Sequence, residues 1–271
     1  MKDINEIICP VCFSELFCDE KTYKCENNHS FDISKHSVVN LSLNNKSSKK
    51  RHGDDKLMVI ARKNFLDKGF YEPILKAVTE LAKKHCQNAT VFVDAGCGEG
   101  YYTNAVAKSI NTKTTIGIDL SKEALRYFKK RNDTATAIVS SIFKMPVKTE
   151  SVDLALNMFA PNANEEFLRI LKKDGFLIRT FVLKNHLIEL KQAIYDNAYY
   201  NSEEEIEIDG FEIVEKQETT TKIHIENEDI ENLFLMTPYY YKTSKADQQK
   251  IKDTKQLDTT VSVMSVIYKK L

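Results

Sequence analysis

Four side chains near the N-terminus have the types and spacing of metal ligands. Cys9 and Cys12 have two residues between them, Cys25 and His29 have three, and twelve residues separate the two pairs. Three sulfurs and one nitrogen complete the tetrahedral shell of a closed zinc site, with no position left for a substrate. The spacing therefore predicts a structural zinc ion. Cys18 is an alternative fourth ligand with poorer spacing. Free thiols are a further alternative, but they would leave this short segment with nothing to hold it together.

A second group of residues surrounds a glycine-rich turn. Residues 94–100 read D-A-G-C-G-E-G and begin at the end of the run 91–96, whose apolar character is typical of a buried strand. Glycines at such a turn let the backbone pass close beneath a bound nucleoside. Asp119 ends the next expected strand, where a carboxylate can accept hydrogen bonds from both ribose hydroxyls. The predicted contacts in the turn are Asp94, Gly96, Gly98, Glu99 and Gly100.

Two ligands fit such a turn, S-adenosylmethionine and a nicotinamide dinucleotide. The acid at position 94 precedes the first glycine, and no third glycine stands at the dinucleotide spacing. The pattern therefore favours S-adenosylmethionine.

Further candidates lie after the next two expected strands. Ligands of open α/β sheets bind beyond the carboxyl ends of the strands. Ser140 and Ser141 end the third strand and are expected to reach the adenine, unless they are ordinary turn residues. Residues 157–161 follow the fourth strand, where the methyl acceptor should lie; for Phe159 the alternative is packing in the core.

The elements that position these residues alternate regularly. Apolar runs separated by helical patterns predict a parallel sheet covered by helices on both faces, a Rossmann-like α/β fold. Ser121 is expected to cap the helix after the second strand. Helical patterns cover 56–68 and a segment from Pro73, and the alternating run 261–271 is expected to be an edge strand. The expected parallel strands cover 91–96, 114–120, 137–141, 152–159 and 176–182.

These patterns divide the chain into a zinc-binding module at 1–37, a basic linker at 38–56 and a Rossmann-like methyltransferase domain at 57–271. The formal net charge is zero, with 39 basic and 39 acidic residues. Bases are concentrated in 35–68 and acids in 196–231, which indicates either one face for a polyanion or two ordinary solvated faces. The sequence contains no apolar run of signal-peptide or membrane-spanning length, so we expect a cytoplasmic protein without a membrane partner.

Motifs along nearly the whole chain resemble the RlmA/RrmA family of ribosomal large-subunit RNA guanine-N1 methyltransferases. They include CPVC, CENNHSFDISKHSVVNL, ARKNFLDKGFYEPI, DAGCGEGYYT, GIDLSK, HLIELK and FLMTPYYY. The resemblance implies methylation of guanine N1 in 23S rRNA with S-adenosylmethionine, a zinc module that grips an RNA hairpin, a homodimer, and no DNA partner. It also implies the zinc ligands Cys9, Cys12, Cys25 and His29. The implied donor contacts are Tyr71, Gly98, Glu99, Tyr102, Thr103, Asp119 and His186.

Two of these donor contacts, Tyr71 and His186, come from the resemblance alone; a core tyrosine and a surface histidine are the ordinary alternatives. Many relatives have Pro-Gly where this chain has Lys173-Asp174-Gly175, and an arginine near the position of Asn157. The first difference is a harmless turn variant. The second leaves the acceptor side and the target guanine open.

The expected reaction is direct transfer of the sulfonium methyl group to guanine N1, driven mainly by positioning. Because N1 carries a proton at neutral pH, a general base or strong support for the enolate-like charge on O6 is needed. Asn157 and His186 are the candidates for acceptor-side work. The target base should leave its stack to enter the site. The rival functions are methylation of a small molecule and RNA binding without catalysis. Phosphate contacts are expected from Lys46, Lys49, Lys50 and Arg51.

Overall fold

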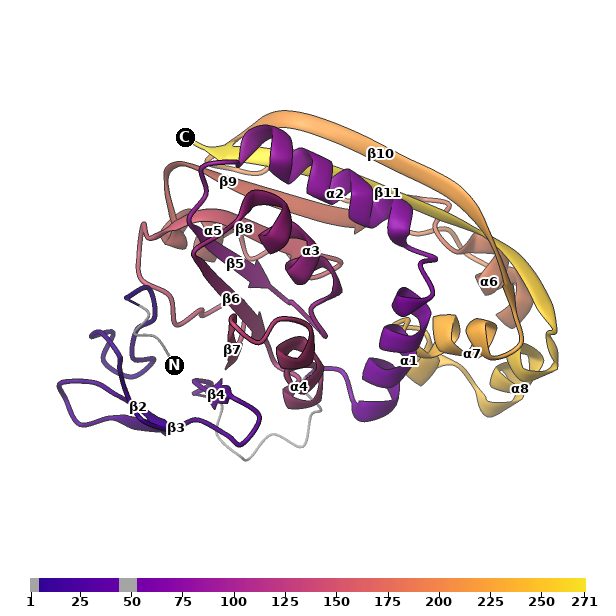
Figure 1. The fold of residues 1–271 in the computed structure, drawn as a ribbon. Coiled ribbons are helices and arrows are strands. Elements are labelled where there is room, and N and C mark those ends of the chain that lie inside the picture. The colour runs from indigo at the N-terminus through magenta and orange to yellow at the C-terminus, as the bar shows by residue number, and fades with distance from the viewer. Residues whose placement is uncertain (1–4, 44–52) are drawn as a thin grey trace.

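The computed structural model describes residues 5–43 and 53–271 and contains one large mixed sheet with a small sheet beside it (Figure 1). The large sheet has eight strands in the order β10-β11-β9-β8-β5-β6-β7-β4. Within the described residues, none of the helices combines the length and apolar character needed to cross a lipid bilayer.

Six neighbouring strands of the large sheet are parallel, which confirms the expected core. Their apolar runs are buried on both faces, as helix-covered parallel strands require. The strands are β4 (Val38–Asn40), β7 (Thr136–Val139), β6 (Thr114–Asp119), β5 (Val91–Ala95), β8 (Val152–Met158) and β9 (Leu171–Val182).

The C-terminal strand is not at the edge, which corrects the expectation for 261–271. β11 (Gln256–Lys270) lies between β9 and β10 (Phe211–Glu226) and is antiparallel to both. β10 is the edge strand on this side of the sheet, and the exposure of its residues alternates along its length. Its many charged residues hid it within the acidic segment of the sequence, so only pairing with β11 identifies it as a strand.

Helices cover both faces of the sheet (Figure 1). One face packs against α1, α2, α3, α6, α7 and α8. α5 lies on the other face, and α4 packs beside β6 and β7. Ser121 Oγ accepts from the Ala124 N–H at 3.2 Å, which confirms the expected cap of α4. The helices are α1 (Lys56–Asp67), α2 (Glu72–His85), α3 (Tyr101–Ile110), α4 (Lys122–Arg131), α5 (Asn164–Ile170), α6 (Ile188–Ile194), α7 (Glu228–Leu235) and α8 (Lys245–Asp253), with a 3₁₀ turn at Tyr240–Lys242.

The N-terminal module is part of the same packed body. Its small antiparallel sheet contains β1 (Phe17–Asp19), β2 (Thr22–Lys24) and β3 (Ser30–Asp32). The first three residues of the expected linker 38–56 form β4 and pair with β7. One hydrophobic cluster joins Ile7, Cys9, Leu16, Tyr23 and Cys25 of the module to Val93, Ile116 and Ile138 of the large sheet.

Close packing at Gly117 allows α4 to lie directly on β6. A Cβ atom at Gly117 would overlap the Phe128 ring and lie 2.9 Å from the Cys97 sulfur. Phe128 is fully buried, so its ring has little room to move away.

We therefore expect Gly117→Ala to lower the free energy of unfolding by about 1–3 kcal/mol, the usual range for overpacking a filled core. Urea denaturation followed by circular dichroism measures this change. Lys122→Ala, an exposed position on α4, is the matched control and should stay within about 0.5 kcal/mol. Equal stabilities of the two variants would contradict the packing argument.

Candidate active site and metal centre

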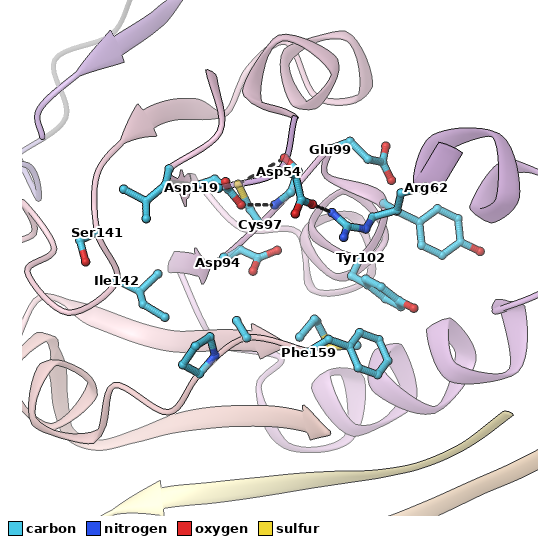
Figure 2. A pocket seen from close by; sticks show the side chains of 18 of the residues that line it. Asp54, Arg62, Asp94, Cys97, Glu99, Tyr102, Asp119, Ser141, Ile142 and Phe159 are labelled. Atoms are coloured by element: carbon cyan, nitrogen blue, oxygen red, sulfur yellow. Dashed lines mark hydrogen bonds and ion pairs between the residues drawn. The ribbon is translucent and has the colours of Figure 1, made fainter. Parts of the chain in front are cut away.

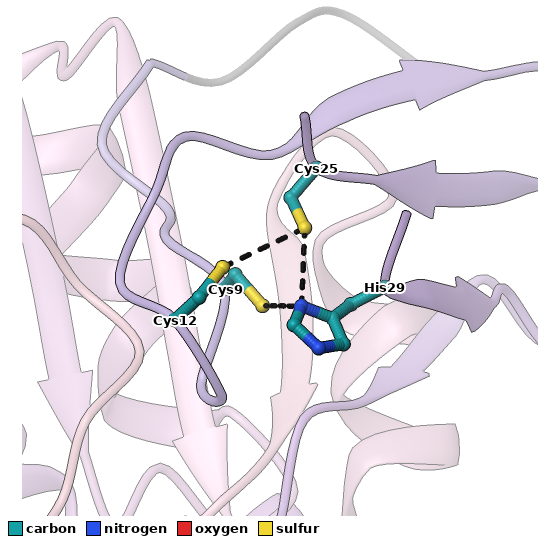
Figure 3. Close-up of side chains that lie close together, drawn as sticks. All are labelled: Cys9, Cys12, Cys25 and His29. Carbon is teal, nitrogen blue, oxygen red and sulfur yellow. Dashed lines mark hydrogen bonds between the residues drawn. The ribbon is translucent and has the colours of Figure 1, made fainter. Parts of the chain in front are cut away.

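The four predicted zinc ligands come together in the N-terminal module (Figure 3). Their ligand atoms all lie within 4.8 Å of one another. His29 Nδ1 is 3.5 Å from the Cys9 sulfur and 3.3 Å from the Cys25 sulfur, and the Cys12 and Cys25 sulfurs are 3.7 Å apart. Cys18 is not in this cluster. Three sulfurs and one nitrogen gathered this closely fit a tetrahedral zinc ion.

Hydrogen bonds at Cys12 favour the ionised thiolate that zinc requires. Ser14 Oγ lies 3.0 Å from the Cys12 sulfur, and hydrogen bonding to Ser14 lowers the pKa of this thiol to about 5. Thiolates, not thiols, bind metal. Cys12 is thus prepared to act as a metal ligand in a closed structural site.

A cavity of about 320 Å³ lies at the carboxyl ends of the parallel strands (Figure 2). The segments after β5, β6, β7 and β8 each contribute side chains, as expected for a ligand site in an open α/β sheet. Among the predicted contacts, those that line the cavity are Asp94, Gly96, Gly98, Glu99, Tyr102 and Asp119; Ser141, Phe159, Ala160 and Pro161 line it as well.

The glycine turn brings the backbone close to the cavity. Gly96, Gly98 and Gly100 have φ angles of +89°, +54° and +84°, which favour glycine. A Cβ at Gly96 would lie 2.8 Å from Ala160 Cβ, and one at Gly100 would lie 2.8 Å from the Phe128 ring. At Gly98 the nearest atom would be Arg62 Nη1 at 3.9 Å, so the surface of this residue is open to a ligand.

The carboxylate of Asp119 joins two turns beside this cradle. It accepts the Gly98 N–H at 2.9 Å and the Ser121 N–H at 2.7 Å, one on each oxygen. Burial raises the pKa of Asp119 in spite of these hydrogen bonds. Because each carboxylate oxygen has a second lone pair, the group can still accept hydrogen bonds from ribose hydroxyls.

Two buried acids of the cavity keep unused acceptors. Thr103 Oγ1 donates to Asp94 Oδ2, and Arg131 Nε donates to Glu99 Oε2. Asp94 Oδ1 and Glu99 Oε1 have no partner among the described residues, and neither has the Tyr102 hydroxyl. Burial raises the pKa of Asp94 to about 7 and also raises that of Glu99. Buried acceptors without partners fit a ligand that brings donors and positive charge, as the ammonium and sulfonium of S-adenosylmethionine do.

Tyr71 and His186 lie outside the cavity wall, next to Phe159. The Tyr71 hydroxyl is 3.4 Å from His186 Nε2, and the Ser262 N–H donates to His186 Nδ1 at 3.2 Å. Since Nδ1 accepts, neutral His186 carries its proton on Nε2. Burial lowers the pKa of His186 to about 4, which keeps the ring neutral. Both nitrogens are therefore engaged, and this geometry disfavours His186 as the base.

The remaining predicted residues support the cavity from behind. The Asn157 amide donates to the carbonyl oxygens of Ala95 at 3.2 Å and Pro161 at 3.3 Å, which fixes the segment after β8. The Ser140 hydroxyl donates to the Lys144 carbonyl at 3.2 Å. Ser140 does not line the cavity, whereas its neighbour Ser141 does. The predicted phosphate contacts Lys46, Lys49, Lys50 and Arg51 lie outside the described residues.

Sequence reasoning missed the wall formed by Gly53, Asp54 and Arg62. Arg62 Nη1 forms an ion pair with Asp54 Oδ2. Gly53, at φ +83°, lies so close to the turn after β6 that a Cβ would be 2.9 Å from the Ser121 nitrogen. Within the described part of the chain, Arg62 is the one cationic side chain of the cavity wall, and it can pair with a ligand carboxylate. Arg62 belongs to the motif ARKNF, but nothing in the neighbouring sequence indicates that this arginine faces a ligand.

Two family models match the chain. The one for the methyltransferase domain covers residues 87–254, more than half of the chain, and the one described as RlmA, N-terminal, covers residues 7–49.

Similar proteins include YxjB of Bacillus subtilis (strain 168), to which 23S rRNA (guanine-N1) methylation is ascribed; it is 29% identical over 96% of both chains. A 23S rRNA (guanine(748)-N(1))-methyltransferase of Streptomyces fradiae is 29% identical over 70% of this chain and 68% of its own. A protein of Micromonospora griseorubida with the same ascribed activity as YxjB is 31% identical over 67% of each chain.

The metal centre yields a prediction with a matched pair of cysteines. Cys25→Ser should remove bound zinc, because it deletes one of the four clustered ligands, whereas Cys18→Ser should retain it. Zinc released from the denatured proteins is measured by a chromogenic chelator. Because Cys25 also packs in the shared hydrophobic cluster, its variant should melt at a lower temperature. Loss of zinc from Cys18→Ser but not from Cys25→Ser would show that Cys18, and not Cys25, is the ligand.

The cavity yields a pH prediction. With the pKa of Asp94 at about 7, this carboxyl is partly neutral in the ligand-free protein at neutral pH. A cationic ligand favours the ionised form, so binding releases a proton, and affinity for S-adenosylmethionine should fall as the pH drops from about 8 to 6. Asp94→Asn should bind S-adenosylmethionine more weakly and lose the proton release that this carboxyl contributes. Asp133→Asn, at an exposed site, should keep both the affinity and the proton release. Calorimetric titrations in buffers of different ionisation enthalpy measure the proton release. An unchanged release in Asp94→Asn would refute the role of this carboxyl.

Proposed function

The chain belongs to the methyltransferase domain family, and we propose that it transfers a methyl group from S-adenosylmethionine to the N1 atom of a guanine in 23S ribosomal RNA. One observation carries the methyl-donor assignment. The cavity places a glycine cradle and the carboxylates of Asp94 and Asp119 against one cationic group, Arg62. This arrangement matches a ligand with a ribose, two cationic centres and one carboxylate.

The acceptor side of the cavity is aromatic. Phe159 follows β8 with a φ of +54°, a strained conformation for a bulky residue, and its side chain is 40% exposed at the cavity wall. Its ring centroid lies 6.2 Å from that of Tyr102 and 6.4 Å from those of Tyr71 and His186. Such a group offers a flat apolar contact to a planar base that has left its stack.

Residues of this chain act mainly by positioning. The bound donor supplies an electrophilic methyl group on a sulfonium. Asp119 would hold its ribose, Arg62 would hold its carboxylate, and the backbone at Gly98 would lie against the bound donor. Asn157 keeps the segment that carries Phe159 in place. Neutral His186 donates to Tyr71 and orients its hydroxyl. Holding donor and acceptor in line supplies much of the rate.

Substrate size distinguishes the proposal from methylation of a small molecule. The zinc module packs on the same sheet as the cavity and joins its wall through the segment after β7, an arrangement that a small acceptor does not need. The unused acceptor oxygens of Asp94 and Glu99 and the intact glycine cradle argue against a relative that binds RNA without catalysis. The proposal further includes RNA binding by the module, a homodimer in the cytoplasm, and neither DNA nor membrane as a partner.

Transfer of tritium from labelled S-adenosylmethionine to unmodified 23S rRNA tests this function. We expect label in the RNA and a discrete stop in primer extension, because methylation at N1 blocks the pairing edge. Asp119→Ala should abolish both signals by removing the acceptor that orders two turns. Label found only in small molecules would favour a small-molecule methyltransferase. RNA binding without methyl transfer would favour a non-catalytic RNA-binding protein.

A further inference from the structure

Two phenylalanines stand exposed on the zinc module. The side chains of Phe13 and Phe17 are 60% and 56% exposed, and both line a groove together with Ile8 and Lys148. Large aromatic side chains usually bury their surface, so a pair left in water on one groove indicates a contact surface.

The backbone at Phe13 strengthens this indication. The residue directly follows Cys12, has a φ of +64°, and donates its N–H to the Cys9 carbonyl at 2.9 Å. Glycine adopts this conformation without strain, whereas a bulky residue does not. A strained and exposed phenylalanine at the metal-binding turn contributes little to packing, which points to a functional contact.

One short segment connects this groove to the active-site cavity. Ser141, Ile142 and Phe143 line the cavity, and Phe143 is 59% exposed. The next residue, Lys144, holds its ammonium 5.8 Å from the centroid of the Phe13 ring. The same segment then pairs with the module, since the Ile8 N–H donates to the Pro146 carbonyl at 3.0 Å. The exposed aromatic groups thus lead from the metal centre to the mouth of the cavity.

The chemistry of the groove favours bases over phosphates. Lys148 is already paired with Glu15 at 2.9 Å, and Glu26 lines the groove as well. Carboxylates repel a phosphate backbone, but they do not prevent stacking of bases on aromatic rings. Unpaired RNA nucleotides present such faces, whereas paired ones do not.

We propose that Phe13, Phe17 and Phe143 form a stacking surface for unpaired nucleotides of the RNA that carries the target guanine. This inference rests on the proposed function and deepens it: the enzyme selects a loop or bulge, not a continuous duplex. Lys144 adds a cation beside the Phe13 ring where the strand passes toward the cavity.

Steady-state methylation of unmodified 23S rRNA by full-length, zinc-loaded protein tests the stacking surface. Phe13→Gly relieves the backbone strain, so its fold should be retained, and Phe17→Ala changes an exposed position. We expect each to raise the KM for RNA about five-fold or more, the effect of losing one stacked base, while kcat changes less than about two-fold. Phe13→Tyr should keep the wild-type KM, because its ring can still stack.

The control is Val214→Ala, which removes an exposed apolar side chain from β10 at the opposite edge of the sheet from β4. Zinc content and calorimetric affinity for S-adenosylmethionine should be equal in all variants, which separates RNA contact from folding and donor binding. Wild-type transfer together with unchanged KM in Phe13→Gly and Phe17→Ala would overturn the stacking surface alone. No transfer to RNA by the wild-type protein would overturn the proposed function, and this inference with it.

Discussion

The carboxylate of Asp119 holds together the two turns from which the active-site cavity is built. It accepts one backbone N–H from the glycine turn after β5 and one from the start of α4 after β6. Charge-assisted hydrogen bonds of this kind are stronger than neutral ones, and both are partly buried here. A single side chain therefore fixes both the backbone at Gly98 and the start of α4.

A second set of contacts ties helix α1 to the same turn. Arg131 of α4 bridges Glu99 of the glycine turn and Asp67 of α1, and Lys63 pairs with Asp67 one helical turn earlier. Burial raises the pKa of Glu99, so removal of Arg131 would leave an unpaired buried acid. This network brings α1 to the cavity wall, where it presents Arg62.

The zinc module completes the architecture of the sheet. In a doubly wound fold, helices cover both faces, but here α5 and the module share the second face (Figure 1). Metal ligation allows this short segment to keep a fixed shape without a core of its own. Its buried side chains then use the apolar surface of β5, β6 and β7 as their packing partner. The metal centre and the cavity are consequently two parts of one packed body, which suits an enzyme that must bind and modify a large substrate.

Local patterns in the sequence determined the chemistry. The zinc ligands lie within 21 residues of one another, the glycine turn within seven, and the parallel strands are short apolar runs with helical patterns between them. Their geometry depends on nearby backbone, so spacing alone predicts it. The same local signal predicted Ser121 as a cap, which the structure confirms.

Contacts between distant segments were decided by tertiary packing. Charged residues concealed β10, and β11 alternates as an edge strand would although it lies inside the sheet. The Asp54–Arg62 wall and the engagement of both His186 nitrogens likewise join residues from separate elements. Sequence spacing carries no information about such pairs, because the chain brings them together only when the sheet and its helices pack. The sequence thus determined which ligands this protein can hold, while the tertiary structure decided which side chains surround them.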